Sequence, residues 1–317
     1  MNINNKIIEL SNLIDEKVLP LITSDYVFWG LPYYINPGDT LIWEGALQLL
    51  KKSPHKCLGT CGWDEYKYIP ISKDTVILVI GGGFFGDVWR KAWSYVMETI
   101  TLYPDNPIVI LPQSVYYESE DIAKEDAKLF AKLKKLTICT RDQQSYENAK
   151  KYFSNNVLLV PDLAFHCDIK KLKRFSLKQS NRILYLKRCD KELSPSQKDV
   201  QGNNVDKRDW PAMSGECSFS MRLISRLISE CSKIKNEKLK DRIVVFLYKY
   251  GNRNIILRDA VRFISQYKEV HTTRLHAMIL SFLLDKKVYI HDNSYGKISG
   301  CYNAWLSDVE NVSIVRR

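Results

Sequence analysis

The sequence predicts an α/β protein built from two Rossmann-like domains. Its 317 residues are about twice the ~150 residues of an average domain. In the first half, short apolar runs alternate with helical patterns, and the same alternation resumes after a basic stretch. Alternation at this spacing is typical of βαβ units and of a parallel, doubly wound sheet. We therefore expect one domain over residues 1–170 and a second over residues 171–317.

Continuous apolar runs in the first half predict strands that are buried on both faces. They are Val76–Ile80, Ile108–Leu111, Leu136–Thr140 and the weaker Val157–Val160. Helical patterns precede and separate these strands, at Leu41–Leu50, Trp89–Thr101, Glu120–Lys134 and Gln144–Phe153. The first domain is thus predicted to be a parallel sheet with helices packed on it.

A basic stretch separates the two halves. From Lys170 to Arg188 eight residues are Lys or Arg and none is acidic. Because Ile183–Leu186 within it predicts a strand, Lys170–Asn181 is the candidate linker. The simpler interpretation is a solvated connector. The alternative is a surface that approaches an anionic membrane carrying a lipid-linked substrate.

The second half repeats the strand and helix patterns of the first. In order, we expect helix Met221–Lys235, strand Ile243–Tyr248, helix Ile255–Tyr267, strand Glu269–His271, helix Leu275–Leu284 and strand Lys287–Ile290. Two Rossmann-like domains joined by a linker make the arrangement called GT-B in glycosyltransferases. Since ligands bind outside the carboxyl ends of strands in open α/β sheets, we expect a site in a cleft between the domains.

Composition narrows the classes of function. The net charge of +11 favours anionic partners: a phosphorylated substrate, nucleic acid or an acidic membrane face. The eight cysteines form no CxxC pair, and Cys57 and Cys61 have no second pair to complete a zinc site, so we expect reduced thiols and no metal. The N-terminus lacks the apolar core of a signal peptide, and no run approaches ~20 apolar residues. These features favour a cytoplasmic protein.

A glycine cluster follows the first predicted strand, in the run Gly81-Gly82-Gly83-Phe84-Phe85-Gly86-Asp87. Glycine lets the backbone come close to a ligand, and exposed N–H groups ahead of a helix attract anions. The run is neither GxGxxG nor a P-loop, which excludes dinucleotide and ATP binding of those kinds. Gly82 and Gly83 are therefore candidate cleft-loop residues, and the alternative is a purely structural turn.

A second loop, Asn36-Pro37-Gly38-Asp39, stands ahead of a predicted helix. Asp39 is either the N-cap of that helix or a carboxylate at the cleft mouth that binds or deprotonates a sugar hydroxyl. Asn36 and Gly38 are candidate cleft-loop residues on the second interpretation.

The run Thr272-Thr273-Arg274-Leu275-His276-Ala277 follows a short predicted strand and opens an apolar helix. Arg274 and His276 thus fall at a helix N-terminus, where the helix dipole opposes each cation by about 0.3–1 kcal/mol. Two such groups at this position indicate an anion site formed by the helix end and the arginine fork. The alternatives are a salt bridge from Arg274 to an acid of the other domain, and a buried structural His276.

Charged residues also follow two other strands of the second half. Arg188 comes directly after Ile183–Leu186, where Asp190 and Glu192 are placed to hold its guanidinium; the alternative is an ordinary exposed turn. Asn293 and Lys297 follow the last strand. Lys297 is either another phosphate contact or a solvated helix residue, and Asn293 is a candidate acceptor-loop or cleft-loop residue.

Taken together, these clusters resemble the polysaccharide pyruvyl transferases along nearly the whole chain. The matching pieces, in order, are NPGDTLIWEGAL, VIGGGFFGD, ILPQSV, TICTRDQQSYENAKKYF, LVPDLAF, YLKRCDKE, TTRLHAMILSFLL and DNSYGKISGCYNAW. The family includes bacterial enzymes of capsule, exopolysaccharide and cell-wall polymer assembly and a yeast Golgi enzyme. This chain lacks the signal anchor expected of the latter, so a bacterial cytoplasmic setting fits better.

The resemblance implies a GT-B-like fold and the transfer of pyruvate from phosphoenolpyruvate (PEP) to a saccharide as a ketal. It also implies that Arg188, Arg274 and His276 match the family's donor-site positions. Arginine pairs bidentately with carboxylate and phosphate, and His276 fits phosphate stabilisation or proton donation. Asp39 and Asp87 are both candidates for the base. The chemistry calls for no metal or redox cofactor.

Two other classes of function are compatible with the sequence. A GT-B glycosyltransferase that uses a nucleotide sugar would share the architecture and the anion site. A polyanion-binding protein without turnover would explain the charge, but no nucleic-acid motif is present. Release of phosphate from PEP, rather than of a nucleotide, separates the first alternative from pyruvyl transfer.

Overall fold

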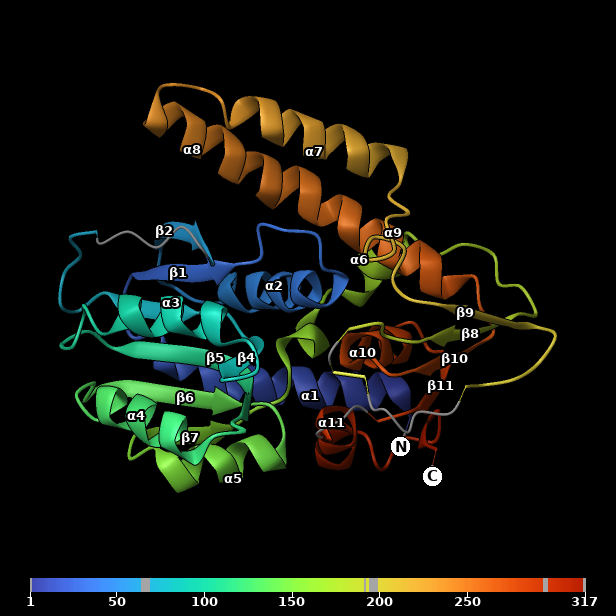
Figure 1. Ribbon diagram of the computed structural model, residues 1–317, viewed down its shortest axis with the longest axis horizontal. Helices are drawn as coiled ribbons and strands as arrows, with labels where there is room; N and C mark the ends of the chain where they lie inside the picture. The colour runs from blue at the N-terminus through green and yellow to red at the C-terminus, as the bar shows by residue number, and fades with distance from the viewer. Residues whose placement is uncertain (1, 64–68, 191, 194–198, 293–295, 316–317) are drawn as a thin grey trace. The chain divides into compact units, whose positions relative to one another are not determined.

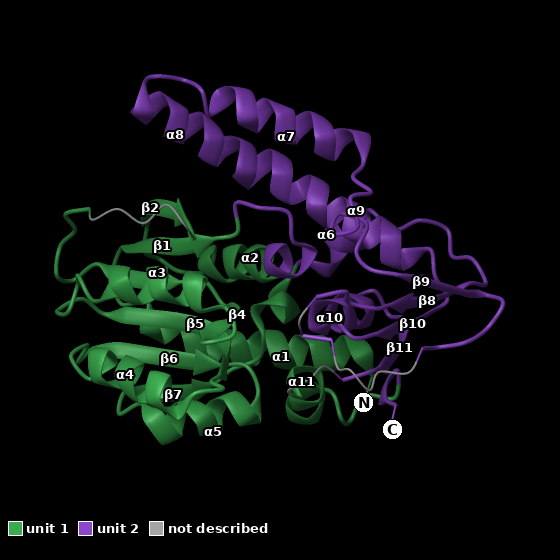
Figure 2. Cartoon of the chain, viewed as in Figure 1, with its two compact units in different colours: residues 1–32, 42–167, 296–310 green, residues 33–41, 168–295, 311–317 purple. Residues whose placement is uncertain are grey.

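A computed structural model describes residues 2–63, 69–190, 192–193, 199–292 and 296–315. The chain forms two compact units (Figure 2). Unit 1 comprises residues 1–32, 42–167 and 296–310, and unit 2 comprises residues 33–41, 168–295 and 311–317. Among the described residues no helix is long and apolar enough to cross a bilayer.

Unit 1 is built around a parallel sheet. Its described strands are β1 (Tyr26–Leu31), β2 (Cys57–Gly62), β3 (Val76–Val79), β4 (Gly82–Gly86), β5 (Ile108–Tyr116), β6 (Leu136–Thr140) and β7 (Asn156–Leu159). They follow the order β2-β1-β3-β5-β6-β7, with β4 beside the far end of β5. All four side chains of β3 are fully buried, as a strand covered on both faces requires.

Helices accompany the strands of unit 1 (Figure 1). They are α1 (Ile3–Val18), α2 (Pro37–Leu50), α3 (Arg90–Ile100), α4 (Glu120–Phe130), α5 (Gln143–Tyr152) and α11 (Lys297–Trp305). Short 3₁₀ turns lie at Leu19–Leu21 and Leu163–His166. An aromatic cluster fills part of the core, where the Phe85 ring stacks on that of Trp93, with a centroid distance of 3.8 Å. The first five residues of α2 and the loop before it group with unit 2.

Unit 2 has a second parallel sheet of described strands in the order β12-β11-β10-β8-β9. The strands are β8 (Ile183–Leu186), β9 (Val205–Arg208), β10 (Glu269–Thr272), β11 (Lys287–Ile290) and β12 (Val312–Ile314). Its helices are α6 (Ile169–Lys173), α7 (Phe219–Cys231), α8 (Glu237–Phe246), α9 (Arg253–Ser265) and α10 (Leu275–Leu283). The short helix α6 overlaps the start of the predicted linker, Lys170–Asn181. A π-helical turn, Leu247–Asn252, joins α8 to α9.

The α/β class with parallel sheets is confirmed by the structure. Three strands have the predicted bounds: Leu136–Thr140, Ile183–Leu186 and Lys287–Ile290. The predicted strand Ile243–Tyr248 is wrong, because these residues continue α8 into the π-helical turn. Val244, Leu247 and Tyr248 recur at helical spacing and pack against α7, and this tertiary contact overrides the strand preference of a β-branched run.

Candidate functional site

The sheet register of unit 2 brings four strand ends to one level. Leu186 of β8 pairs with Thr272 of β10 and with Arg208 of β9, and Thr272 pairs with Ile290 of β11. The residues that follow these strands therefore emerge at the same carboxyl edge, where ligands bind in open α/β sheets. Arg188, Asp209 and Arg274 all come from this edge.

Arg188 is held by the two acids that the sequence placed beside it. Its Nε and Nη2 donate to Asp190 at 2.7 and 3.0 Å, and its Nη1 donates to Glu192 Oε2 at 2.6 Å. The backbone N–H of Arg188 donates to Thr273 Oγ1 at 2.8 Å, which ties β8 to the loop before α10. Arg188 is 6% exposed, so it is not an ordinary solvent-exposed turn residue.

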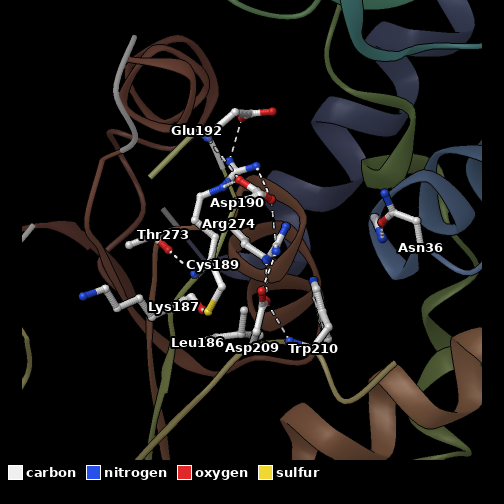
Figure 3. Close-up of polar contacts among 12 residues, drawn as sticks. Asn36, Leu186, Lys187, Cys189, Asp190, Glu192, Asp209, Trp210, Thr273 and Arg274 are labelled. Carbon is white, nitrogen blue, oxygen red and sulfur yellow. Dashed lines mark hydrogen bonds and ion pairs between the residues drawn. The ribbon is translucent and has the colours of Figure 1, made fainter. Parts of the chain in front are cut away.

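Arg274 stands at the N-cap position of α10 and joins the same network. Its Nε and Nη2 donate to the two oxygens of Asp209 at 2.5 and 2.6 Å, and Nη2 also approaches Asp190 Oδ2 at 3.3 Å. Figure 3 shows Arg274 between Asp190 and Asp209. The acids that pair with Arg274 here belong to its own unit, rather than to the other domain.

Two guanidiniums thus face three carboxylates at this edge. Burial opposes the charge of Arg188, but the hydrogen bonds to Asp190 and the charge of Glu192 outweigh it and raise the pKa of Arg188. For Asp190, burial raises the pKa and the bonds to Arg188 lower it, with a net lowering. Both shifts favour the charged forms of Arg188 and Asp190. The longest contact in the network is the 3.3 Å one between Arg274 and Asp190.

His276 lies in the first turn of α10 and packs against the first turn of α2. A Cβ atom built on Gly38 would lie 2.4 Å from His276 Nδ1 and 2.9 Å from Cγ. Because real Cβ atoms do not approach other atoms so closely, only glycine fits at position 38 with the imidazole where it is. The structure thus brings together two of the predicted site residues, Gly38 and His276.

The loop around Gly38 is held by its own side chains. Asn36 precedes the first helical residue, Pro37; its side-chain Oδ1 accepts from Gly38 N–H at 2.9 Å and its carbonyl accepts from Thr40 N–H. Asn36, not Asp39, therefore occupies the capping position. Asp39 Oδ2 accepts from Asn36 Nδ2 at 2.6 Å and from Tyr34 Oη at 2.9 Å. Figure 3 draws Asn36 apart from the Arg274 network, with no bond between them.

In unit 1, the glycine cluster forms strand β4 instead of a turn that leads directly into a helix. Gly82 pairs with Gln113 and Gly86 with Tyr116 of β5, and α3 begins only at Arg90. Gly86 has φ +129°, and a Cβ there would lie 1.8 Å from the Tyr116 carbonyl oxygen. This glycine is thus required by close backbone pairing, which is the structural interpretation of that part of the run.

Asp87 has a clear anchoring contact. Its Oδ1 and Oδ2 accept from Glu118 N–H at 3.0 and 2.9 Å, and Oδ2 accepts from Ser119 N–H at 2.9 Å. Ser119 is the N-cap of α4. Asp87 therefore fixes the loop that starts this helix.

Lys297 belongs to unit 1, whereas Arg188, Arg274 and His276 belong to unit 2. A Cβ built on Gly83 would lie 2.7 Å from Lys297 Nζ and 3.0 Å from Arg141 Nη2, so Gly83 lies against both cationic side chains. Arg141 is fully buried, and its Nη1 donates to Asp162 Oδ2 at 2.7 Å. Asn293 lies outside the described residues.

Sequence reasoning missed Asp209, which makes the bidentate pair with Arg274. It follows β9. The residues of this strand, Val205–Arg208, show no alternation of apolar and polar side chains, so the sequence did not predict a strand there. The fully buried Trp210 beside it was the available signal, since an isolated tryptophan after a charged run marks packing. Among the described residues, no group of three or more metal-ligating side chains gathers.

A family model and two relatives point to one family. A family model described as polysaccharide pyruvyl transferase matches residues 36–295. EpsO of Bacillus subtilis (strain 168), a proposed pyruvyl transferase, is 31% identical over 97% of this chain and 92% of its own. Pyruvyl transferase 1 of Schizosaccharomyces pombe is 26% identical over 90% of this chain and 71% of its own.

A solved structure shares the fold. The crystal structure of a functionally uncharacterised Klebsiella pneumoniae protein superimposes with a TM-score of 0.64 at 19% identity. The match covers 97% of this chain and 99% of that one.

Proposed function

The chain belongs to the polysaccharide pyruvyl transferase family, and from this premise we propose that it transfers a pyruvyl group from PEP to a saccharide. The product is a cyclic ketal, and phosphate is released. The observation that carries the proposal is the pair of guanidiniums, Arg188 and Arg274, held at one sheet edge by a shared contact to Asp190.

The two arginines bind the PEP anion in this proposal. Each guanidinium is oriented by carboxylates, which fixes its remaining N–H groups for a bidentate contact. Because three carboxylates already outnumber the two guanidiniums, a bound trianion has to displace one of them. The 3.3 Å contact between Arg274 and Asp190 is the longest in the network and is the one we expect to open.

His276 supplies the proton in the reaction. A proton is added to the methylene carbon of PEP, and C2 becomes electrophilic. One sugar hydroxyl attacks C2 and loses its proton to a base; the C2–O bond to phosphate then breaks, and the second hydroxyl closes the ring. Its proton leaves with the phosphate. Across the reaction, therefore, one hydroxyl proton replaces the proton delivered to carbon and the other is carried by phosphate.

Asp39 is the better candidate for the base. Its carboxylate lies one residue from Gly38, which contacts His276, and its partners Tyr34 and Asn36 are neutral donors. Asp87, by contrast, is engaged by two backbone N–H groups at the start of α4. Lys297, Gly82, Gly83 and Asn293 stay predictions for the donor and cleft roles.

The remaining parts of the proposal concern the acceptor and its setting. We propose a lipid-linked precursor of an extracellular polysaccharide as the acceptor, consistent with the family's link to capsule and exopolysaccharide assembly. That places the enzyme in the cytoplasm, at the inner face of the membrane. That the two units face a common cleft, as in GT-B enzymes, stays a prediction.

The decisive experiment is incubation with PEP and a panel of lipid-linked saccharides, with product mass and released phosphate as readouts. A product that carries one added pyruvate ketal, with one phosphate per product, supports the proposal. Thermal unfolding tests the donor separately. PEP should raise the melting temperature, because a ligand at a hundredfold excess over its Kd adds about 2.7 kcal/mol to the free energy of unfolding. Stabilisation by a UDP-sugar, with none by PEP, would identify a glycosyltransferase instead.

A further inference from the structure

Helix α7 carries apolar residues on both of its faces. Met221, Ile224 and Ile228 are buried and pack in the core of unit 2. On the opposite face, at a spacing of four, Phe219, Leu223 and Leu227 are 74, 49 and 46% exposed. A helix that packs by one stripe is ordinarily polar on the other. These three side chains, called here the α7 stripe, are therefore unexplained by the fold.

Basic residues flank the α7 stripe. Arg222 and Arg226 are exposed and each precedes a stripe leucine. Within the described part of the chain neither forms an ion pair, whereas Glu230 pairs with Lys233 and Glu237 with Lys240.

The helical hairpin as a whole is basic. Residues 219–252, from α7 to the end of the π-helical turn, hold eight basic and three acidic residues, a net charge of +5. Nearly half of the chain's net charge of +11 is thus concentrated on about a tenth of its length. Figure 1 shows α7 and α8 as a hairpin that extends away from the sheet of unit 2.

We propose that α7 docks unit 2 onto an anionic membrane surface. Exposed Phe and Leu side chains beside Arg are the composition of helices that lie in the interface plane, with the apolar residues below the headgroups. Arg222 and Arg226 would then contact lipid phosphates, each strengthening binding by about fivefold. The inference is independent of pyruvyl transfer, since it requires no donor, acceptor or turnover.

A second copy of the chain fits the α7 stripe less well. A two-fold contact between two such hairpins would bring together two surfaces of net charge +5, and like charges across an interface are unfavourable. The same charge is complementary to anionic lipid. The proposed docking surface is α7 and not α8, where exposed Leu239 lies between the acids Glu237 and Asp241.

Vesicle flotation with the full chain tests the proposal. The probe is vesicles of phosphatidylcholine with about a third phosphatidylglycerol, against vesicles of phosphatidylcholine alone; we expect binding to the first and little to the second. Replacing the stripe leucines together (Leu223→Ser with Leu227→Ser) should weaken binding at least tenfold. Arg222→Gln with Arg226→Gln should weaken it about 25-fold.

Matched control variants test whether removing an exposed leucine or exposed charges elsewhere on the protein also weakens vesicle binding. Leu102→Ser removes a leucine that is 54% exposed in unit 1, and Lys170→Gln with Lys173→Gln removes two exposed charges from the predicted linker. Both should bind vesicles like the unmodified protein, and all variants should unfold at similar temperatures because every altered residue is exposed.

Two outcomes would overturn the inference. One is unchanged vesicle binding by the α7 variants, including the case in which the linker variant alone loses binding. The other is a dimer, detected by light scattering after size exclusion, that becomes a monomer in the Leu223→Ser, Leu227→Ser variant. The α7 stripe would then be an interface between copies of this chain.

Discussion

At the scale of single residues, Arg274 is held through the geometry of its guanidinium as well as its charge. Both Nε and Nη2 are needed for the bidentate bond to Asp209, and Nη2 also reaches Asp190. Lysine keeps the charge but has no planar fork. We expect Arg274→Lys to weaken PEP binding by about tenfold or more. Titration calorimetry with PEP measures this.

The control for that change is Arg182→Lys, because Arg182 makes a similar two-atom pair with Asp206 in the same unit. It should leave PEP affinity unchanged. Equal losses in the two variants would mean that the effect of Arg274→Lys reflects general instability. Wild-type affinity in Arg274→Lys would place Arg274 outside the donor site.

A change at Gly38 tests whether the contact between the first turn of α2 and His276 matters for turnover. An added methyl group would lie 2.4 Å from Nδ1, so Gly38→Ala must displace the imidazole or the loop. A displacement of about 1 Å commonly costs ~100-fold in rate, and we expect kcat to fall by at least tenfold. Gly59→Ala is the matched control, because a Cβ there meets nothing within 4 Å. Equal kcat values for both alanine variants would refute a catalytic contact.

His291 makes unit 2 sensitive to acid. Burial, with the nearby His271, lowers the pKa of His291 to about 4, and its Nε2 lies 3.1 Å from His271 Nδ1. Unfolded histidine titrates near 6.5, so between about pH 6.5 and 4 the unfolded chain binds a proton that the folded chain does not. Stability is therefore lost as the pH falls through this window, by up to about 3 kcal/mol.

Denaturant unfolding at several pH values checks this expectation. The His291→Gln variant should lose less stability between pH 6.5 and 4 than the unmodified chain. Other titrating groups contribute to both proteins, so the difference between them isolates His291. Parallel curves for the two proteins would show that His291 titrates normally.

At the scale of elements, the sequence predicted the type and bounds of a helix or strand best where the local pattern and the tertiary packing favour the same structure. Strands Ile183–Leu186 and Lys287–Ile290 are short apolar or mixed runs between clear breaks, and both were predicted with their observed bounds. In Ile243–Tyr248 the β-branched run favours a strand locally, but packing on α7 requires helical spacing. Helix α1 was not predicted, although its buried Ile7, Leu10 and Ile14 have helical spacing.

The anchoring of α4 by Asp87 gives a prediction for this scale. An asparagine at position 87 keeps one acceptor oxygen but loses the second and the charge that favours two backbone N–H groups. We expect Asp87→Asn to lower the free energy of unfolding by about 1–2 kcal/mol, with little change in kcat per folded molecule. Asp39→Asn should instead lower kcat with little change in the free energy of unfolding, since its proposed role is in proton transfer. Loss of turnover in a stably folded Asp87→Asn variant would make Asp87 the base.

At the scale of the whole molecule, the sequence predicted which strand ends carry the charged groups but not how those groups pair. The pairing of Arg188 with Asp190 and Glu192 could be predicted, because all three residues lie within a run of five. The pairing of Arg274 with Asp209 joins positions 65 residues apart and depends on β9 lying next to β8. No local pattern encodes such a neighbour, so this part of the site needed the structure.

The proposed chemistry also predicts how the whole enzyme responds to chelation. Charge on PEP is neutralised by arginine in this proposal, and no step uses a metal. We expect EDTA to leave phosphate release from PEP unchanged, in a preparation first shown to turn over. Loss of activity that a single divalent ion restores would show that a metal takes part.

The way the chain passes between its two units has a consequence for biosynthesis. The polypeptide changes unit after Pro32, Leu41, Cys167, Tyr295 and Glu310, and α11 returns to unit 1 near the C-terminus. There Trp305 Nε1 donates to the carbonyl oxygen of Arg141 at 2.7 Å. During translation Trp305 leaves the ribosome long after Arg141, so unit 1 reaches its final form only after residue 305 has been made. A premature stop before residue 297 would therefore deprive both units at once, removing α11 from one and β12 from the other.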